Sequence, residues 1–293
     1  MVLSALIDRI RDQLRVDDHV ALVTIKTARG STPQKAGAAM MVTKEGAISG
    51  TIGGGALEFA AIQDAMRSMA SGQSGDFRKL YPLGPDLGQC CGGVVELETS
   101  IFSQDMSQEI NPRRDGLEGD APTPLALFGA GHVGRALVIA LASLPFKISW
   151  IDEREGIFPD PCPRNVTAIH SDDPIKLIAS LPRHSYCLIM THSHALDLAL
   201  VDAALRREDF FYIGLIGSAT KRARFQSRLQ QGGLGAPARQ RLVCPVGLPS
   251  LYGKDPAVIA ASIAADLLIR RQASQHECDA EPFVTPEKKF IRL

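Results

Sequence analysis

The segment "LALFGAGHVGRAL", residues 125–137, decides the fold of the second half of the chain. Gly129, Gly131 and Gly134 form a G-x-G-x-x-G pattern that follows a strand-like apolar run and opens a helix-like run. The first glycine permits a tight turn, the second lets a pyrophosphate approach the backbone, and the third allows close helix packing. Because the helix N-terminus then faces the anion, the pattern predicts a phosphate-binding turn.

Strand-like and helix-like patterns alternate on either side of this turn. Strands are expected at "KISWID", "NVTAIH", "YCLIMT" and "FYIGLIG", and helices at "DPIKLIASL", "ALDLALVDAALRR" and "KRARFQSRLQQ", with a long final helix from Asp255 to about Gln272. Such alternation with short connections implies a parallel sheet covered by helices on both faces. Residues 124–293 are therefore predicted to form a Rossmann-like, doubly wound parallel-sheet domain.

Two charged residues lie at and just after the end of the strand that comes next after the glycine pattern. Asp152 ends that strand, where a carboxylate accepts a hydrogen bond from a ribose hydroxyl in dinucleotide-binding domains. Arg154 is either a contact for a ligand phosphate or carboxylate, or a surface arginine on a loop. Since fold and ligand are separate claims, NAD(P) is a candidate ligand and not a consequence of the fold.

The segment "THSHALD", residues 191–197, directly follows a predicted strand. His192 and His194 therefore open a helix at the carboxyl edge of the sheet, where loop residues commonly contact a bound ligand. The pattern partly resembles the H-x-H-x-D-H motif of metallo-β-lactamase-like hydrolases, but Asp197 comes one residue late and the last histidine is missing. We expect a ligand-contacting surface here and keep a metal site as the minor alternative.

Residues 1–102 predict a smaller α+β domain, and the polar segment 103–123 predicts a linker. The expected strands are "VALVTIKTARG", a pair joined by a turn in "AAMMVTKEGAISGTI", and "VVELETSIF". In "TIGGGALE", Gly53, Gly54 and Gly55 precede a helix, which suits an anionic group. A flexible turn is the alternative, but three glycines in succession cost entropy that a simple turn would not require. Glu58 is read as a helix-dipole residue or as an acceptor for a ring N–H.

Adjacent cysteines occur in "GPDLGQCCGG", residues 84–93. Neighbouring side chains cannot easily share one tetrahedral metal centre, and a disulfide between them would strain the peptide. Cys90 and Cys91 are instead interpreted as a soft-ligand or sulfur-handling site, where the flanking glycines leave room for a bulky cofactor. The alternative is one buried structural cysteine beside one exposed thiol.

Composition excludes several classes of partner. The 293 residues carry 32 Lys and Arg against 32 Asp and Glu, so net charge favours neither nucleic acid nor a membrane surface. No run reaches the roughly 20 apolar residues of a membrane span, and the first residues resemble an amphipathic helix more than a signal peptide. Six scattered cysteines do not form a disulfide framework. We expect a cytoplasmic protein with no nucleic-acid or membrane partner.

Several segments together resemble a known family over nearly the whole chain. These are "RGSTPQKAGAAMMV", "GTIGGGALE", "LGQCCGG", "FGAGHVGRAL", "IGLIGSATKRARF" and "GLPSLYGKDPAVIAASIAADLL", which resemble the XdhC/CoxI family of xanthine dehydrogenase accessory proteins. The part "GLPSLYGKD" departs from the run typical of other members, so the contacts of that loop are not carried over.

The resemblance implies a non-catalytic chaperone for the molybdenum cofactor. Such a protein binds the molybdopterin form, holds it during sulfuration by a cysteine desulfurase, and inserts it into the molybdenum subunit of apo xanthine dehydrogenase. A molybdenum cofactor biosynthesis protein is a further implied partner, and a homo-oligomer is expected. The family motifs fall on Gln89, Cys90 and Cys91, on the Gly53–Gly55 loop and on the glycine turn, with the two thiols directed to molybdenum or its sulfur.

Two rival functions stay open on the sequence alone. One is an NAD(P)-dependent oxidoreductase that uses the Rossmann-like domain, with His192 or His194 as the base. The other is a scaffold that joins the desulfurase to the dehydrogenase without binding cofactor. Retained molybdenum and pterin fluorescence favour the carrier, whereas quenching of Trp150 emission by NADH favours the oxidoreductase.

Overall fold

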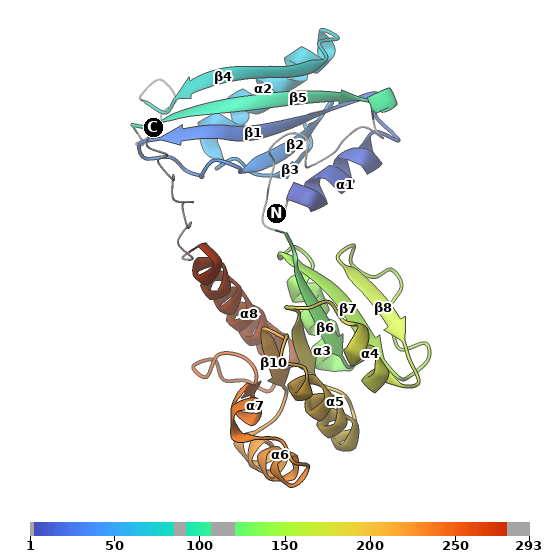
Figure 1. Ribbon diagram of the computed structural model, residues 1–293. Coiled ribbons are helices and arrows are strands. Elements are labelled where there is room, and N and C mark those ends of the chain that lie inside the picture. The colour runs from blue at the N-terminus through green and yellow to red at the C-terminus, as the bar shows by residue number, and fades with distance from the viewer. Residues whose placement is uncertain (1–2, 85–91, 107–120, 280–293) are drawn as a thin grey trace, which may run out of the picture. The chain divides into compact units, whose positions relative to one another are not determined.

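The computed structural model describes residues 3–84, 92–106 and 121–279 (Figure 1). The chain divides into two compact units, Met1–Pro122 (unit 1) and Thr123–Leu293 (unit 2). Among the described residues, no helix combines the length and the apolar character needed to cross a bilayer. Each unit has its own buried hydrophobic clusters.

Unit 1 contains a five-stranded antiparallel sheet in the order β3-β2-β1-β5-β4. The strands are β1 (His19–Arg29), β2 (Ala39–Thr43), β3 (Ile48–Gly50), β4 (Gly75–Pro82) and β5 (Val94–Ser103). The helices are α1 (Leu3–Gln13), α2 (Gly55–Ala70) and the 3-10 turn η2 (Gln104–Met106). Regular structure of unit 1 thus continues a few residues into the segment 103–123 that was predicted as the linker.

The central strand β1 is buried on both faces of this sheet. Ala21, Val23 and Ile25 face the core that α2 completes, whereas Val20 and Leu22 face the core that α1 completes. Side chains alternate between the two faces of a strand, so the two helices on opposite faces bury residues 20–25, whereas Lys26–Arg29 at the end of β1 are partly buried or exposed. This explains why the sequence there is a continuous apolar run and not an alternating one.

Unit 2 contains a six-stranded parallel sheet in the order β11-β10-β9-β6-β7-β8. The strands are β6 (Thr123–Phe128), β7 (Phe146–Asp152), β8 (Val166–His170), β9 (Tyr186–Ile189), β10 (Tyr212–Leu215) and β11 (Leu242–Val243). The chain winds outward from β6 to β8, returns to β9 beside β6, and winds outward again. This is the doubly wound order with its switch point between β6 and β9, where ligands bind in such sheets.

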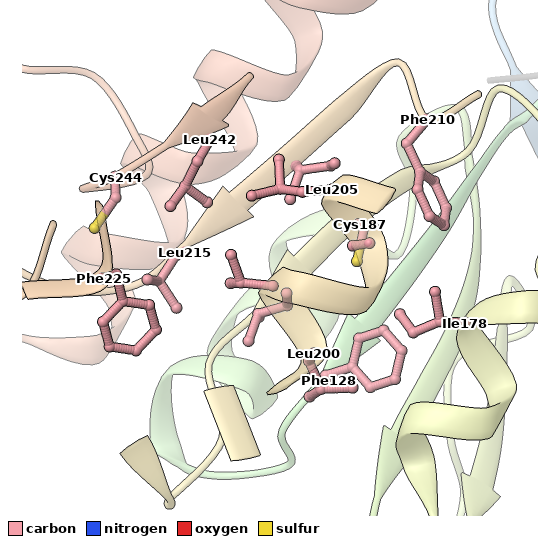
Figure 2. Close-up of a cluster of buried hydrophobic side chains, with 14 of the residues drawn as sticks. Phe128, Ile178, Cys187, Leu200, Leu205, Phe210, Leu215, Phe225, Leu242 and Cys244 are labelled. Carbon is pink, nitrogen blue, oxygen red and sulfur yellow. The ribbon is translucent and has the colours of Figure 1, made fainter. Parts of the chain in front are cut away.

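Helices cover both faces of this parallel sheet. They are α3 (His132–Leu141), α4 (Pro174–Ser180), α5 (His194–Arg206), α6 (Ala219–Gln231), α7 (Ala236–Gln240) and α8 (Pro256–Asp279). On one face α3 and α8 pack together over Trp150 and Leu127. On the other, Ile178, Leu200 and Phe225 from α4, α5 and α6 gather against the strands (Figure 2).

The predicted fold class, an α+β domain followed by a Rossmann-like domain, is confirmed. Four elements were not predicted, namely β4, η2, α7 and β11, and the final helix ends at Asp279 and not near Gln272. Cys187 is fully buried in the same cluster as Ile178, Leu200 and Phe225. Burial raises the pKa of its thiol to about 12. Cys187 is therefore a packing residue and not a reactive thiol.

Candidate functional site

The glycine turn lies at the switch point, against the loop that follows β9. Gly129 has a φ of +116°, and a Cβ atom built on it would lie 2.3 Å from the carbonyl oxygen of Met190. A Cβ on Gly134 would lie 2.2 Å from the carbonyl oxygen of Gly129. The first and third glycines are thus required by the fold itself, because a side chain at either position would meet backbone atoms.

Gly131 differs from its two neighbours in the pattern. A Cβ built there meets nothing within 4 Å, and its φ of −74° is open to any residue. Packing within the described chain therefore does not explain this glycine, and the space beside it is open. Gly131 is also the N-cap of α3 and contributes no side-chain cap, while Ser193 and Ser218 cap α5 and α6. An anion placed here would be bound by N–H groups at the start of α3.

Asp152 holds the glycine turn to β7 and is itself saturated with hydrogen bonds. Its Oδ2 accepts from the Ala130 N–H at 2.7 Å and from Arg154 Nη2 at 2.9 Å. Its Oδ1 accepts from the Arg154 N–H at 3.0 Å and from Arg154 Nε at 2.9 Å. Four donors fill the acceptor capacity of a carboxylate, so a ribose hydroxyl could bind Asp152 only by displacing Arg154. Arg154 does contact a carboxylate, but one of its own chain.

This arrangement makes the acid stability of unit 2 depend on Asp152. Burial alone would raise the pKa of Asp152, but hydrogen bonds from Arg154 and Ala130 outweigh it and lower the pKa from 3.8 to about 2. The ionised carboxylate therefore stabilises the fold by about 2 kcal/mol above pH 4, and this contribution is lost as the pH falls through about 2.

We expect Asp152→Asn to be less stable than the wild type by about 2 kcal/mol near neutral pH, with the difference shrinking from about pH 5 toward about pH 2. The measurement is urea unfolding at a series of pH values, followed by the fluorescence of Trp150. A stability difference that stays constant over this range would mean that the ionised carboxylate contributes nothing.

Trp150 reports directly on the glycine turn. It is the single tryptophan of the chain, it is fully buried, and its Nε1 donates to the carbonyl oxygen of Gly129 at 3.1 Å. A ligand that shifts the backbone of the turn changes the surroundings of the indole. Trp150 emission therefore serves both as a binding signal for the turn and as an unfolding signal for unit 2.

The two predicted histidines face different cavities on either side of Thr191. His192 is half-exposed, lies with its Nε2 3.5 Å from a carboxylate oxygen of Glu153, and shares a small cavity with Asp152. His194, the first residue of α5, lines a larger pocket together with residues of α6. The structure thus brings His192 to the glycine-turn side and places His194 in a separate pocket.

The carboxylate of Asp197 is occupied by contacts within unit 2. Its carboxylate is buried and accepts from the N–H and hydroxyl of Thr191 at 3.0 and 2.8 Å and from Lys221 Nζ at 2.7 Å. Within residues 3–84, 92–106 and 121–279, no three His, Cys, Asp or Glu side chains gather as a metal site would require. The minor metal alternative for the "THSHALD" segment gains no support.

The Gly53–Gly55 loop of unit 1 is filled by a carboxylate of the chain itself. Glu58 Oε2 accepts from the Thr51 hydroxyl at 2.7 Å, from the Ile52 N–H at 3.1 Å and from the Gly54 N–H at 3.0 Å. Gly53, Gly54 and Gly55 all have positive φ, at 122°, 74° and 64°. The left-handed backbone thus explains the three glycines, and an external anion would have to compete with Glu58.

The 30–34 loop of unit 1 lies against Gly53 of the glycine-rich loop and against Gly93. Gln89, Cys90 and Cys91 lie outside the described residues, but the glycines that follow them are placed. A Cβ on Gly93 would lie 2.4 Å from the carbonyl oxygen of Ser31, and a Cβ on Gly53 would lie 2.6 Å from Pro33. The 30–34 loop therefore contacts both the glycine-rich loop and the segment adjoining the cysteine pair.

Sequence reasoning missed a group of basic residues in the pocket beside His194. Lys221, Arg224 and Arg228 of α6 line it, whereas the sequence pattern indicated only that they belong to a helix. Their signal was present, because "TKRARFQSR" places Arg224 and Arg228 four residues apart, hence on one face of a helix. What the sequence did not show was that this face meets His194.

Comparison with known proteins agrees with this two-unit architecture. The family model described as the XdhC Rossmann domain matches residues 125–267, and that of the XdhC and CoxI family matches residues 14–81. The uncharacterized protein YqeB of Escherichia coli (strain K12) is 28% identical over 251 residues, which cover 85% of this chain and 43% of YqeB. The chain thus spans less than half the length of that relative.

A solved structure shows a similar fold. The crystal structure of a protein from Bacillus halodurans, described as a xanthine dehydrogenase, is 21% identical and superposes with a TM-score of 0.71. The match covers 91% of this chain and 96% of that one. At this identity the likeness concerns the fold alone, whereas the two family models together span most of the chain. The chain belongs to the XdhC and CoxI family.

Proposed function

We propose that this protein is a carrier of the molybdenum cofactor that serves xanthine dehydrogenase. Family membership suggests a non-catalytic role in the maturation of xanthine dehydrogenase. In the finer proposal, the protein binds the molybdopterin form as cargo and holds it while a cysteine desulfurase replaces an oxo ligand by a terminal sulfide. It then inserts the cofactor into the apo dehydrogenase.

The observation that carries this proposal is the open space at Gly131. The fold explains Gly129 and Gly134 but not the glycine between them, and α3 begins there without a side-chain cap. A phosphate group fits such a position, because the backbone can approach it closely and the helix end favours negative charge. Molybdopterin carries a phosphate, so we assign that group to the start of α3.

The cysteine pair is proposed to handle the sulfur-bearing end of the cargo. Thiolates suit soft metal centres, and Cys90 and Cys91 stand among glycines that leave room for a bulky group. The contacts of the 30–34 loop support a common site in unit 1, because that loop adjoins both Gly53 and Gly93. Gln89 belongs to the same proposed site.

An NAD(P)-dependent oxidoreductase is the alternative from another class, and one observation counts against it. A nicotinamide dinucleotide needs an acceptor for its ribose hydroxyls at the end of the second strand, which is Asp152. The oxygens of Asp152 already accept from Arg154 and from the Ala130 N–H. The phosphate part of a dinucleotide site is therefore supported here, whereas the ribose part is not.

The test measures molybdenum and pterin in the full-length protein, purified from cells that make the cofactor. We expect both in a fixed ratio to protein, and we expect Gly131→Ala to lose most of them while remaining folded, because the new methyl group occupies the open space. Retention by Gly131→Ala equal to wild type would remove the glycine turn from the site. Absence of both components, with Trp150 emission quenched by NADH, would favour the oxidoreductase.

The same preparation tests the cysteine pair. A Cys90→Ala, Cys91→Ala double variant should fail to deliver active cofactor to apo xanthine dehydrogenase. Normal binding and delivery by this variant would remove the thiols from the proposal and leave the phosphate contact in place.

A further inference from the structure

A second pocket opens at the carboxyl edge of the parallel sheet of unit 2. The β9–α5 loop separates this pocket from the glycine turn. It has a volume of about 730 Å³ and lies between the loop after β9 and the start of α6. Pockets of about 300–1,000 Å³ are the usual size for small-molecule ligands. Its place at the ends of β9 and β10 is where loops of doubly wound sheets contact ligands.

The charge of this pocket is positive and only partly neutralised. Lys221 Nζ is bound by Asp197 at 2.7 Å and by the carbonyl oxygen of Ile216 at 2.9 Å, so its charge is paired. Arg224 and Arg228 also line the pocket, and in the described part of the chain neither guanidinium has a hydrogen-bond or carboxylate partner. The charged residues of α6 are all basic, so the helix offers no internal partner.

Four other arginines of unit 2 are paired with carboxylates of the chain. Arg154, Arg206, Arg207 and Arg270 each hold an aspartate within 3 Å. Like charges four residues apart on a helix repel each other, so the fold gains nothing from Arg224 and Arg228 as a pair. An anion between them would convert that repulsion into two charge-assisted contacts.

The remaining walls suit a phosphorylated molecule larger than a bare ion. Phe225 belongs to the core beneath α6 (Figure 2). Together with Ile216 it lines the pocket and supplies apolar surface. Thr220 and His194 supply a hydroxyl and an imidazole with no partner among the described residues. The combination of apolar surface with a few converging polar groups is typical of small-molecule sites.

We propose that this pocket binds the phosphate group of a phosphorylated small molecule, held mainly by Arg224 and Arg228 with His194 and Thr220 as further donors. Bidentate geometry makes arginine the favoured partner of phosphate. This pocket is distinct from the start of α3. The proposal of a phosphate site in the pocket therefore does not depend on whether the cargo at the glycine turn is molybdopterin.

The test is calorimetric titration of the full chain with inorganic pyrophosphate at low ionic strength. It is carried out in the Gly131→Ala background, so that the glycine turn contributes little. We expect saturable binding that weakens about tenfold or more in the Arg224→Gln, Arg228→Gln double variant, since each lost contact involves a charged donor. Thermal unfolding of each variant confirms that the fold is intact.

Arg222→Gln is the matched control, because Arg222 is an exposed arginine of the same helix that does not line the pocket. It should change the affinity less than about twofold, as expected for a distant charge. Equal weakening by Arg222→Gln would mean diffuse attraction to a basic helix and would overturn the proposal. Unchanged binding in the double variant, or no saturable binding at all, would overturn it as well.

Discussion

Replacing Asp197 by alanine is expected to lower the free energy of unfolding of unit 2 by about 3–5 kcal/mol. The reason is that Asp197 is buried and Lys221 is largely covered, with side-chain exposures of 2% and 12%. Removing the carboxylate leaves the ammonium group without its ionic partner and leaves the Thr191 N–H without its acceptor. A buried charge that loses its partner costs far more than an exposed one.

Urea unfolding followed by Trp150 fluorescence measures this loss in unit 2, which contains the only tryptophan. Asp202→Ala is the matched control on the same helix, because Asp202 pairs with Arg206 in solvent and should cost at most about 1 kcal/mol. Replacing both buried partners, Asp197→Leu with Lys221→Met, should restore part of the loss. If Asp197→Ala cost no more than Asp202→Ala, the buried pair would not support the fold.

Gly129→Ala is expected to destabilise unit 2 by about 3 kcal/mol or more. The residue has a φ of +116°, which L side chains rarely adopt, and its new methyl group would lie 2.3 Å from the carbonyl oxygen of Met190. Neither the turn nor the loop after β9 can move freely, because the Gly129 N–H also donates to the Ile151 carbonyl at 2.8 Å.

Gly131→Ala is the control for this prediction, two residues further along the same turn. Its methyl group meets nothing within 4 Å, and alanine in place of glycine at an N-cap costs less than about 1 kcal/mol. The two variants should thus separate folding from ligand binding. A similar loss of stability in both, measured by urea unfolding, would show that the turn is uniformly sensitive and that Gly131 has no special freedom.

The sequence predicted unit 2 well because its central strands are buried on both faces and read as short apolar runs between helical patterns. It did not predict β4, whose residues are mostly exposed at the edge of the unit 1 sheet and carry little hydrophobic signal. The elements α7 and β11 are five and two residues long, too short for a periodic pattern. The elements that were not predicted are thus those that are too exposed or too short to show a hydrophobic pattern in the sequence.

For the candidate sites, features that depend on local spacing were predicted, whereas features that depend on the folded structure were not. The glycine turn was predicted because its spacing is local, and the structure adds that only Gly131 faces open space. The roles of Asp152 and Glu58 were not predictable, because each carboxylate binds backbone N–H groups whose position depends on the folded loop. The basic pocket was missed since His194 and Arg224 are thirty residues apart and meet only through the packing of α5 and α6.

The position of β1 in unit 1 has a consequence for the order of folding during synthesis. β1 lies near the start of the chain, yet one of its two neighbours is β5, the last strand of the unit. The sheet therefore closes only after residue 103 has left the ribosome, and until then one edge of β1 stays exposed to other chains. Pairing over such a separation is slow compared with hairpin formation. Because the cysteine pair precedes β5 in the sequence, its thiols emerge before the sheet of unit 1 is complete.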